Sequence, residues 1–264
     1  MKKLIILLLL VISGLTFGKT LKLGTSSYPG VEMFNIIKDD LAAQGIELEL
    51  IEMNDYVTPN LALADGAIDI NSFQHIQYLN QFCKDKGLDL VSAGETYVVA
   101  LGLYSEKYKS VDEIPAKSII AIPNDPTNAG RALIMLHNAG IIKLEDPSNL
   151  LATEFDIVEN PKKLKFKLIE APQLPRVIKD VAACVINGGY AVEAGYIPTE
   201  DAILVEDVNK SPYVNIFAVR KGDENREDIK AFVKAYQSDK MKKYVLEKFK
   251  GGYIPCLLYT SPSP

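Results

Sequence analysis

One stretch of the sequence orders its polar residues in a way that suits binding of a carboxylate. Residues 124–131 read NDPTNAGR and follow the apolar run 118–122. Asp125 is a candidate helix N-cap and Pro126 suits the first helical position, so Arg131 falls within roughly the first two turns. A carboxylate there would meet both a guanidinium and the positive end of the helix dipole. The alternative is a surface arginine that pairs with an acidic residue.

Two further asparagines stand at or within apolar strands, where an amide can bind a polar ligand group. Asn187 follows the predicted strand 183–186 and precedes two glycines, which let the backbone approach a ligand closely. Asn215 lies in the apolar run 213–219 and requires a hydrogen-bond partner if it is buried. The alternatives are a turn asparagine for Asn187 and a bond to neighbouring backbone for Asn215.

Three aromatic residues and a histidine form another group. Tyr56, Phe73 and Tyr78 fall in loops or helix starts after the second and third predicted strands, and His75 lies between the latter two. Together these side chains could enclose an apolar ligand group, and a thioether is well matched because its sulfur makes favourable contacts with ring edges. The alternatives are rings that only pack the core and a histidine that only bonds the start of its own helix.

Catalytic and metal-binding signatures do not accompany these residues. GxGxxG, GxSxG and SxxK arrangements are absent, and the glycines of 14–18 are separated by three residues instead of the four of a phosphate-binding loop. The only histidines, His75 and His137, lack neighbours at zinc-ligand spacing, and the three cysteines form no CxxC pair. We therefore expect a protein that is not an enzyme and that holds no metal or cofactor.

The elements that must position these residues alternate between strands and helices, which is typical of an α/β fold with parallel sheets. Strands are predicted at 21–24, 46–52, 68–70, 118–122, 165–169, 183–186 and 213–219, and helices at 31–44, 59–64, 75–86, after 125, at 228–235 and at 240–248. The apolar run 96–104 is interpreted as a strand that crosses between two lobes, with a ligand cleft between them. The alternative is one continuous doubly wound sheet.

Composition and the first residues indicate an exported globular protein. The chain has 264 residues, of which 48% are hydrophobic, and a formal net charge of −5, so neither nucleic acid nor an anionic membrane is an expected partner. Lys2 and Lys3 precede the apolar run 4–12 and small residues up to Gly18, the pattern of a secretory signal peptide. An uncleaved N-terminal anchor is the alternative.

Four stretches resemble the NlpA/MetQ family, the methionine-binding lipoproteins of bacterial ABC importers. They are 54–63 (NDYVTPNLAL), 73–79 (FQHIQYL), 122–133 (IPNDPTNAGRAL) and 185–188 (VING), and the similarity extends from about residue 19 to 255. The resemblance implies a two-lobed periplasmic-binding-protein fold, type II-like, that closes on free methionine, L- or D-, in the cleft between the lobes. It also implies delivery to an ABC permease and its ATPase subunits. The alternative is the same fold binding another small amino acid or a dipeptide.

The resemblance also implies roles for individual residues. Arg131 would hold the ligand carboxylate, and Asn187 and Asn215 would hold polar ends of the ligand. The aromatic cage would consist of Tyr56, Phe73, His75 and Tyr78. Asn128 belongs to the same matching stretch as Arg131 and completes the expected ligand-binding set.

The expected organisation is a signal peptide at 1–18, a first lobe at 19–104 and 221–255, a second lobe at 105–220, and a tail at 256–264 that continues past the usual end of the family. Family members commonly carry a lipidated cysteine after the signal, whereas Lys19 follows Gly18 here. The expected location is therefore the periplasm or the outer face of the cytoplasmic membrane, without a lipobox cysteine. The loop 26–32, SSYPGVE, also departs from the proline-histidine-alanine-glutamate run of relatives.

Overall fold

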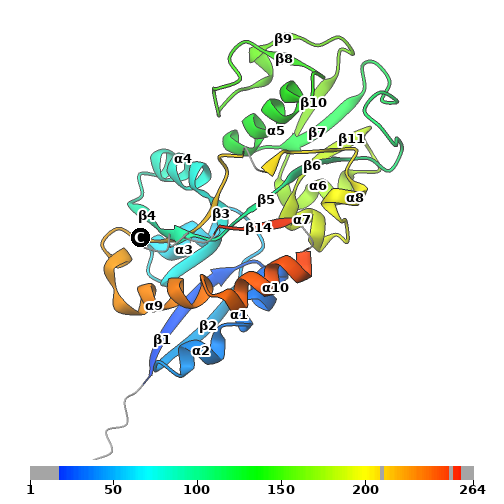
Figure 1. The fold of residues 1–264 in the computed structure, drawn as a ribbon. Coiled ribbons are helices and arrows are strands. Elements are labelled where there is room, and N and C mark those ends of the chain that lie inside the picture. Colours follow the sequence, from blue (N-terminus) through cyan, green and yellow to red (C-terminus); the bar gives the residue numbers. More distant parts are fainter. Residues whose placement is uncertain (1–17, 209–210, 250–251, 257–264) are drawn as a thin grey trace, which may run out of the picture.

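The chain is organised around two separate five-stranded sheets, each with its own helices (Figure 1). The computed structural model describes residues 18–208, 211–249 and 252–256. The predicted signal peptide, apart from Gly18, and the predicted tail beyond Cys256 lie outside the described residues. Two sheets rule out the single continuous sheet and agree with the predicted two-lobed α/β fold.

The first lobe is defined by the sheet with strand order β2-β1-β3-β13-β4. β1 pairs in parallel with β2 and β3, whereas β13 runs antiparallel between β3 and β4. Its strands are β1 (Lys19–Thr25), β2 (Ile46–Glu52), β3 (Ile70–His75), β4 (Leu90–Glu95) and β13 (Asn215–Arg220), and its main helices are α1 (Glu32–Asn35), α2 (Lys38–Ala42), α3 (Thr58–Ala64), α4 (Ile76–Lys86), α9 (Glu227–Tyr236) and α10 (Asp239–Phe249).

The second lobe is defined by the sheet with order β10-β7-β11-β6-β12. β7 pairs in parallel with β10 and β11, so the carboxyl ends of β7 and β11 lie at the same edge of the sheet. The strands are β6 (Leu101–Tyr104), β7 (Ile119–Pro123), β10 (Lys165–Ile169), β11 (Ala183–Asn187) and β12 (Leu204–Val205), the helices are α5 (Pro126–Asn138), α6 (Leu174–Val177), α7 (Gly188–Glu193) and α8 (Pro198–Asp201), and a hairpin is formed by β8 (Lys143–Leu144) and β9 (Ile157–Glu159).

Two strands lie in the opposite sheet from the one that the predicted lobe boundaries assign to them. The boundaries place 101–104 in the first lobe and 215–220 in the second, whereas β6 belongs to the second sheet and β13 to the first. The apolar run 96–104 is interrupted at Ala100, so that β5 (Tyr97–Val99) pairs with β14 (Tyr253–Pro255) and β6 pairs with β11. The run 213–219, which contains most of β13, is apolar on both faces, and such a strand suits the centre of either sheet.

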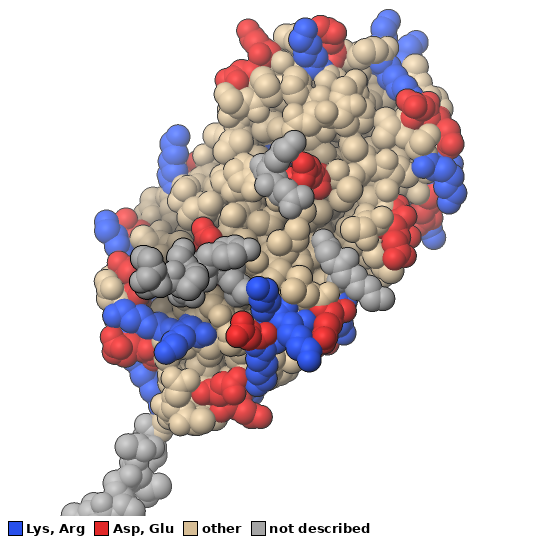
Figure 2. Space-filling model, in the orientation of Figure 1, with Lys and Arg blue, Asp and Glu red and all other residues tan. Residues whose placement is uncertain are grey.

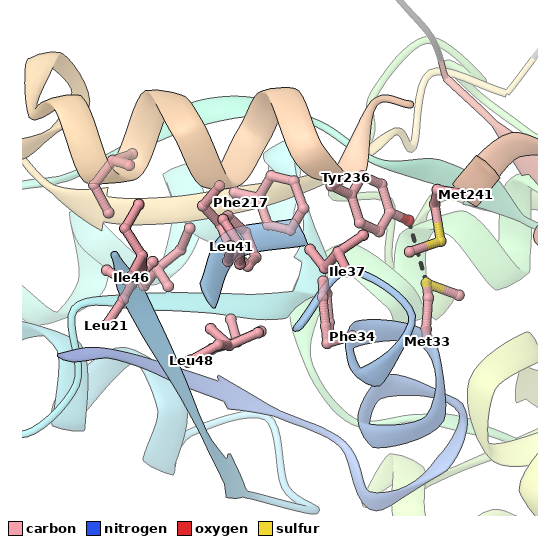
Figure 3. Packing of buried hydrophobic residues seen from close by; sticks show 14 of the residues in the cluster. Leu21, Met33, Phe34, Ile37, Leu41, Ile46, Leu48, Phe217, Tyr236 and Met241 are labelled. Atoms are coloured by element: carbon pink, nitrogen blue, oxygen red, sulfur yellow. Dashed lines mark hydrogen bonds between the residues drawn. The ribbon is translucent and has the colours of Figure 1, made fainter. Parts of the chain in front are cut away.

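The core of the first lobe joins the two ends of the described chain. Phe34 packs against Phe217 of β13 and against Phe232 and Tyr236 of α9, with ring centroids 5.6–6.0 Å apart. Figure 3 shows Phe34, Phe217 and Tyr236 with labelled residues of β1, β2 and α2. The Tyr236 hydroxyl donates to Met33 Sδ at 3.2 Å. The last two helices therefore pack on the first lobe, as predicted.

Two predicted elements of the first lobe differ from the structure. The helix expected at 31–44 is divided into α1 and α2, with Ile37 between them at a ψ of 0°, away from helical values. The third strand is expected at 68–70, whereas β3 runs from Ile70 to His75, so Phe73 lies in a strand instead of a loop. His75 ends this strand and caps α4, so the helix predicted from residue 75 begins one residue later. Although its sequence is rich in polar residues, β3 can be a buried strand because the amides of Asn71 and Gln74 bond to each other and to Asn60.

The surface carries charges of both signs. On the face shown in Figure 2, lysine and arginine side chains lie interspersed with aspartate and glutamate around the periphery of the molecule. This face therefore presents no extended field of one sign. In the described part of the chain, no helix combines the length and the apolar character that a membrane crossing requires.

Candidate ligand-binding site

A pocket lies between the two lobes and is lined by all eight of the predicted site residues. Its volume is about 60 Å³, several times the roughly 10–15 Å³ that one water molecule requires. The pocket therefore fits a small molecule. The predicted lining residues are Tyr56, Phe73, His75, Tyr78, Asn128, Arg131, Asn187 and Asn215, and the further ones are Ser26, Tyr28, Pro29, Met53, Asp55, Gln74, Tyr97, Val99, Gly189, Tyr190, Glu193 and Tyr253.

The lobes touch each other across this pocket. The Tyr190 hydroxyl of the second lobe donates to the backbone oxygen of Asn54 in the first lobe at 3.2 Å. The rings of Tyr190 and Tyr56 lie 5.2 Å apart, and His75 bonds to Asn128 at 3.2 Å. The structure therefore has the two lobes closed on each other at the site.

Arg131 enters the pocket from the start of α5, as the sequence predicts. The Asp125 carboxylate caps this helix by accepting from the backbone nitrogen of Asn128 at 2.9 Å, and Pro126 occupies its first turn. Gly130 is required next to Arg131, because a Cβ there would lie 2.4 Å from the backbone oxygen of Leu150. The helix can therefore sit against the loop that contains Leu150 and bring Arg131 to the cleft.

The guanidinium of Arg131 is buried, with 3% of the side chain exposed, and is paired on one edge only. Nε donates to both carboxylate oxygens of Glu206, at 3.1 and 3.2 Å, and Nη2 donates to Glu206 and to the backbone oxygen of Val99. The ring of Tyr213 covers one face, 4.5 Å from the guanidinium carbon. Among the described residues nothing accepts from Nη1, so both of its N–H donors have no partner in this part of the chain.

This geometry combines the two alternatives that the sequence left open for Arg131. The residue pairs with an acid, as in the structural alternative, but it is buried in the cleft instead of lying on the surface. Glu206 is separated from Arg131 by 75 residues and belongs to no recognisable motif. Sequence reasoning therefore had no signal for this partner.

Three side chains from both lobes form a hydrogen-bonded chain beside Arg131. Asn128 Oδ1 accepts from Asn187 Nδ2 at 2.8 Å and bonds to His75 Nε2 at 3.2 Å, while Asn128 Nδ2 donates to the Asp125 carboxylate. The amide of Asn128 is thus fully engaged and orients its neighbours. The buried Oδ1 of Asn187 has no partner among the described residues, so it is an acceptor available to a ligand.

His75 is held as a neutral ring at the end of β3. Its Nδ1 accepts from the backbone nitrogen of Tyr78 at 3.0 Å and caps α4, which assigns the proton to Nε2 and makes that nitrogen the donor to Asn128. Burial, and then the positive charge of Arg131, lower the pKa of His75 to about 3. The ring is therefore a fixed donor near neutral pH. It does bond its own helix, as the alternative proposed, and it also reaches the second lobe.

Asn187 and Asn215 lie at opposite sides of the cleft. Asn187 is the last residue of β11, and α7 begins immediately after it. Gly188 is needed there, since a Cβ would lie 2.3 Å from Val99 Cγ2. Asn215 begins β13 opposite His75, and only 6% of it is exposed. No side-chain bond from Asn215 to other described residues is present, so the backbone partner proposed as its alternative role is not found.

The other half of the pocket is aromatic. The ring of Tyr56 lies 5.7 Å from both Phe73 and Tyr78, and the Tyr78 hydroxyl donates to the backbone oxygen of Tyr56 at 2.6 Å. Tyr190 extends this cluster from the second lobe. Burial raises the pKa values of the three tyrosines, so their hydroxyls stay protonated. These rings present an uncharged, apolar wall opposite the polar chain. Tyr190 was missed, although it follows Asn187 by three residues on the first turn of a helix.

The described residues contain no group of three or more His, Cys, Asp or Glu side chains that could hold a metal ion. Cys83, Cys184 and Cys256 are all free.

Comparison with known proteins gives a consistent result. The model of the NlpA lipoprotein family matches residues 21–257. The D-methionine-binding lipoprotein MetQ of Salmonella typhi is 50% identical over 212 residues, which are 80% of this chain and 78% of the relative. The protein of the same name from Escherichia coli K12 is 49% identical over the same shares of the two chains, 80% and 78%.

Solved structures agree in fold. A nutrient-binding protein from Burkholderia cenocepacia bound to methionine is 44% identical, with a TM-score of 0.86 over 90% of this chain and 100% of that chain. A structure of the methionine-binding protein MetQ is also 44% identical, with a TM-score of 0.87 over 90% of this chain and 98% of the other. The two-lobed fold expected from the sequence is thus confirmed by similarity as well as by the sheets.

Proposed function

Because this chain belongs to the NlpA lipoprotein family, we propose that it is a non-catalytic binding protein that captures free methionine and delivers it to an ABC import permease. One observation carries the proposal. A buried guanidinium with unused donors, a buried amide oxygen without a described partner, and a cluster of aromatic rings line the same small pocket. These three features match the carboxylate, the ammonium group and the apolar thioether side chain of methionine.

In the proposed binding mode, each end of the ligand has its own partner. The carboxylate accepts from Arg131 Nη1, and the ammonium group donates to Asn187 Oδ1. The thioether lies among Tyr56, Phe73 and Tyr78, because sulfur makes favourable contacts with ring edges. Asn128 and His75 act by orienting Asn187 and by joining the two lobes.

The contacts between the lobes support a mechanism in which the protein closes on its ligand. Closure is favoured by binding only if the ligand makes contacts in the closed state that the open state lacks. Arg131 and Asn187 approach the ligand from the second lobe, while Phe73, Tyr78 and Asn215 approach it from the first. A ligand held by both sets therefore stabilises the closed form, which is the form that a permease would recognise.

Export is part of the proposal. The predicted signal peptide would be removed after Gly18 and leave a mature chain that starts at Lys19, outside the cytoplasm. The curated relatives are named lipoproteins. A lipid-anchored form is thus the competing outcome, and the mass of the mature N-terminal peptide distinguishes it from an unmodified one.

Ligand identity can be tested by thermal unfolding. The protein is unfolded in denaturant to remove any carried ligand, refolded, and its melting temperature is recorded with each of the twenty amino acids. A ligand at 100 times its dissociation constant adds about 2.7 kcal/mol of stability, which is easily resolved. We expect a selective rise with methionine. A selective rise with another amino acid, or a flat panel from refolded protein, would refute methionine as the ligand.

A further inference from the structure

Glu206 forms an ion pair with Arg131 but does not line the pocket. It lies in the segment that leads from β12 back to the first lobe. Its side chain is 12% exposed. Besides Arg131, its carboxylate accepts from the backbone nitrogen of Leu101 at 3.3 Å and from the Ser211 hydroxyl at 3.1 Å. All of these partners are donors, which fits an ionised carboxylate.

We propose that Glu206 makes the pocket select zwitterions over anions of the same shape, by cancelling the charge of Arg131. The inference rests on the proposed function, because it takes methionine as the reference ligand. It concerns a residue that does not line the pocket. Its role is to set the net charge that a ligand meets there.

The charge balance of the pocket carries this inference. Apart from the tyrosines, the other ionisable side chains in the lining are Asp55, Glu193 and His75. His75 is neutral, Glu193 is exposed to solvent, and the Asp55 carboxylate accepts from the backbone nitrogens of Val57 and Thr58, each at 2.7 Å. Arg131 and Glu206 are thus a buried pair of opposite charges at the carboxylate end of the pocket.

A neutral pair treats two classes of ligand differently. In a poorly hydrated site, charges interact more strongly than in water. An anion brings a net negative charge to a guanidinium that is already compensated, and it remains close to the Glu206 carboxylate. A zwitterion brings no net charge, and its ammonium group has the unpaired Asn187 Oδ1 as a partner. Without Glu206, the full positive charge of Arg131 would favour the anion.

The test compares two ligands that differ only in the amino group. Dissociation constants are measured by calorimetry for methionine and for 4-(methylthio)butanoate, which lacks the ammonium group, with the wild-type protein and with Glu206→Gln. We expect the preference for methionine to fall about tenfold or more in Glu206→Gln, as for the loss of a close charge partner. Glu206→Asp, which keeps the charge, should retain most of the preference.

A role of Glu206 in positioning Arg131 alone would weaken both ligands equally and leave their ratio unchanged, which would overturn the inference. Glu159→Gln is a matched control, because Glu159 also pairs with a basic residue, Lys143 at 2.7 Å, but is 59% exposed and does not line the pocket. Its ratio should equal that of the wild type.

Two further measurements keep the outcome interpretable. Glu206→Ala is assayed with and without formate, and recovery of the preference with formate would show that the missing carboxylate charge is responsible. A preference that formate leaves unchanged would contradict the inference. Refolded wild-type protein that binds no methionine would instead overturn the proposed function, and this inference with it.

Discussion

Two arginines of this molecule both pair with acidic residues, but they differ in how many of their guanidinium nitrogens have a hydrogen-bond acceptor. At the far end of the first lobe, every guanidinium nitrogen of Arg226 has an acidic partner: Nε and Nη2 donate to Asp228, and Nη1 donates to Asp69 and Asp223, over 2.7–3.2 Å. In the cleft, Arg131 has one acidic partner, and its Nη1 has none among the described residues. All the guanidinium nitrogens of Arg226 are used by contacts within the fold, whereas Arg131 keeps unpaired donors, which is what the proposed ligand contact requires.

Exposure alone would not separate the two sites. The side chain of Arg226 is 24% exposed and that of Arg131 is 3% exposed, so the arginine proposed to bind ligand is the more deeply buried of the two. What differs is the number of acceptors around each guanidinium. The comparison therefore teaches that unused hydrogen-bond donors at a buried charge, more than accessibility, distinguish the arginine proposed to bind ligand from the one that joins parts of the fold.

The largest expected effect comes from removing the arginine with unpaired donors. Arg131→Ala should weaken methionine binding by about 2–5 kcal/mol, because a desolvated carboxylate loses its charged partner. Calorimetric titration measures this directly, and Arg226→Ala provides the matched control with unchanged affinity. Near-wild-type affinity in Arg131→Ala would show that the unpaired donors of Arg131 do not hold the ligand carboxylate.

Removing the fully paired arginine should affect folding stability instead. Arg226→Ala leaves the buried carboxylate of Asp228 with fewer donors, which costs about 1–3 kcal/mol in the free energy of unfolding. Burial raises the pKa of Asp228, but hydrogen bonds from Arg226 and Lys19 outweigh it and lower that pKa to about 2. Chemical denaturation measures the loss. A variant with unchanged stability would show that the network contributes nothing despite its geometry.

The smallest expected effect is the pH dependence of binding. Since the pKa of His75 is lowered to about 3, its ring is neutral from pH 5 to 8, and the methionine dissociation constant should stay constant over that range. The effect on stability has a definite sign. The unfolded chain binds a proton below about pH 6.5, so stability should decrease as pH falls from there toward 3. Calorimetry at several pH values tests the first statement, and a step in affinity near pH 6 would contradict it.

Much of the site could be predicted because its residues follow local rules. Arg131 lies in the second turn of a helix with a recognisable N-cap and proline, and the end of β11 was placed within one residue of Asn187. Family resemblance then selected the eight lining residues. What local rules could not provide was Glu206, since a contact across 75 residues depends on how the second sheet is closed by β12.

The errors in the fold have the same physical origin. β3 was predicted to be too short because its polar residues satisfy one another inside the lobe, and sequence alone does not show that Asn60, Asn71 and Gln74 will meet. β6 and β13 were assigned to the wrong lobes because an apolar strand fits the centre of either sheet. Hydrophobic patterning indicates strands that are apolar on both faces, but it does not show polar ones such as β3, and tertiary pairing decides which sheet a strand joins.

The position of β13 has a consequence for how the protein folds as it is synthesised. β4 pairs only with β13 in its sheet, so residues 90–95 have no neighbouring strand there until residues 215–220 have left the ribosome. The strands of the second sheet all lie between residues 101 and 205 and are complete before that point. The second lobe can therefore form first, during translation. Until β13 is synthesised, the part of the first lobe that is already made has an unpaired strand edge, which chaperones can bind.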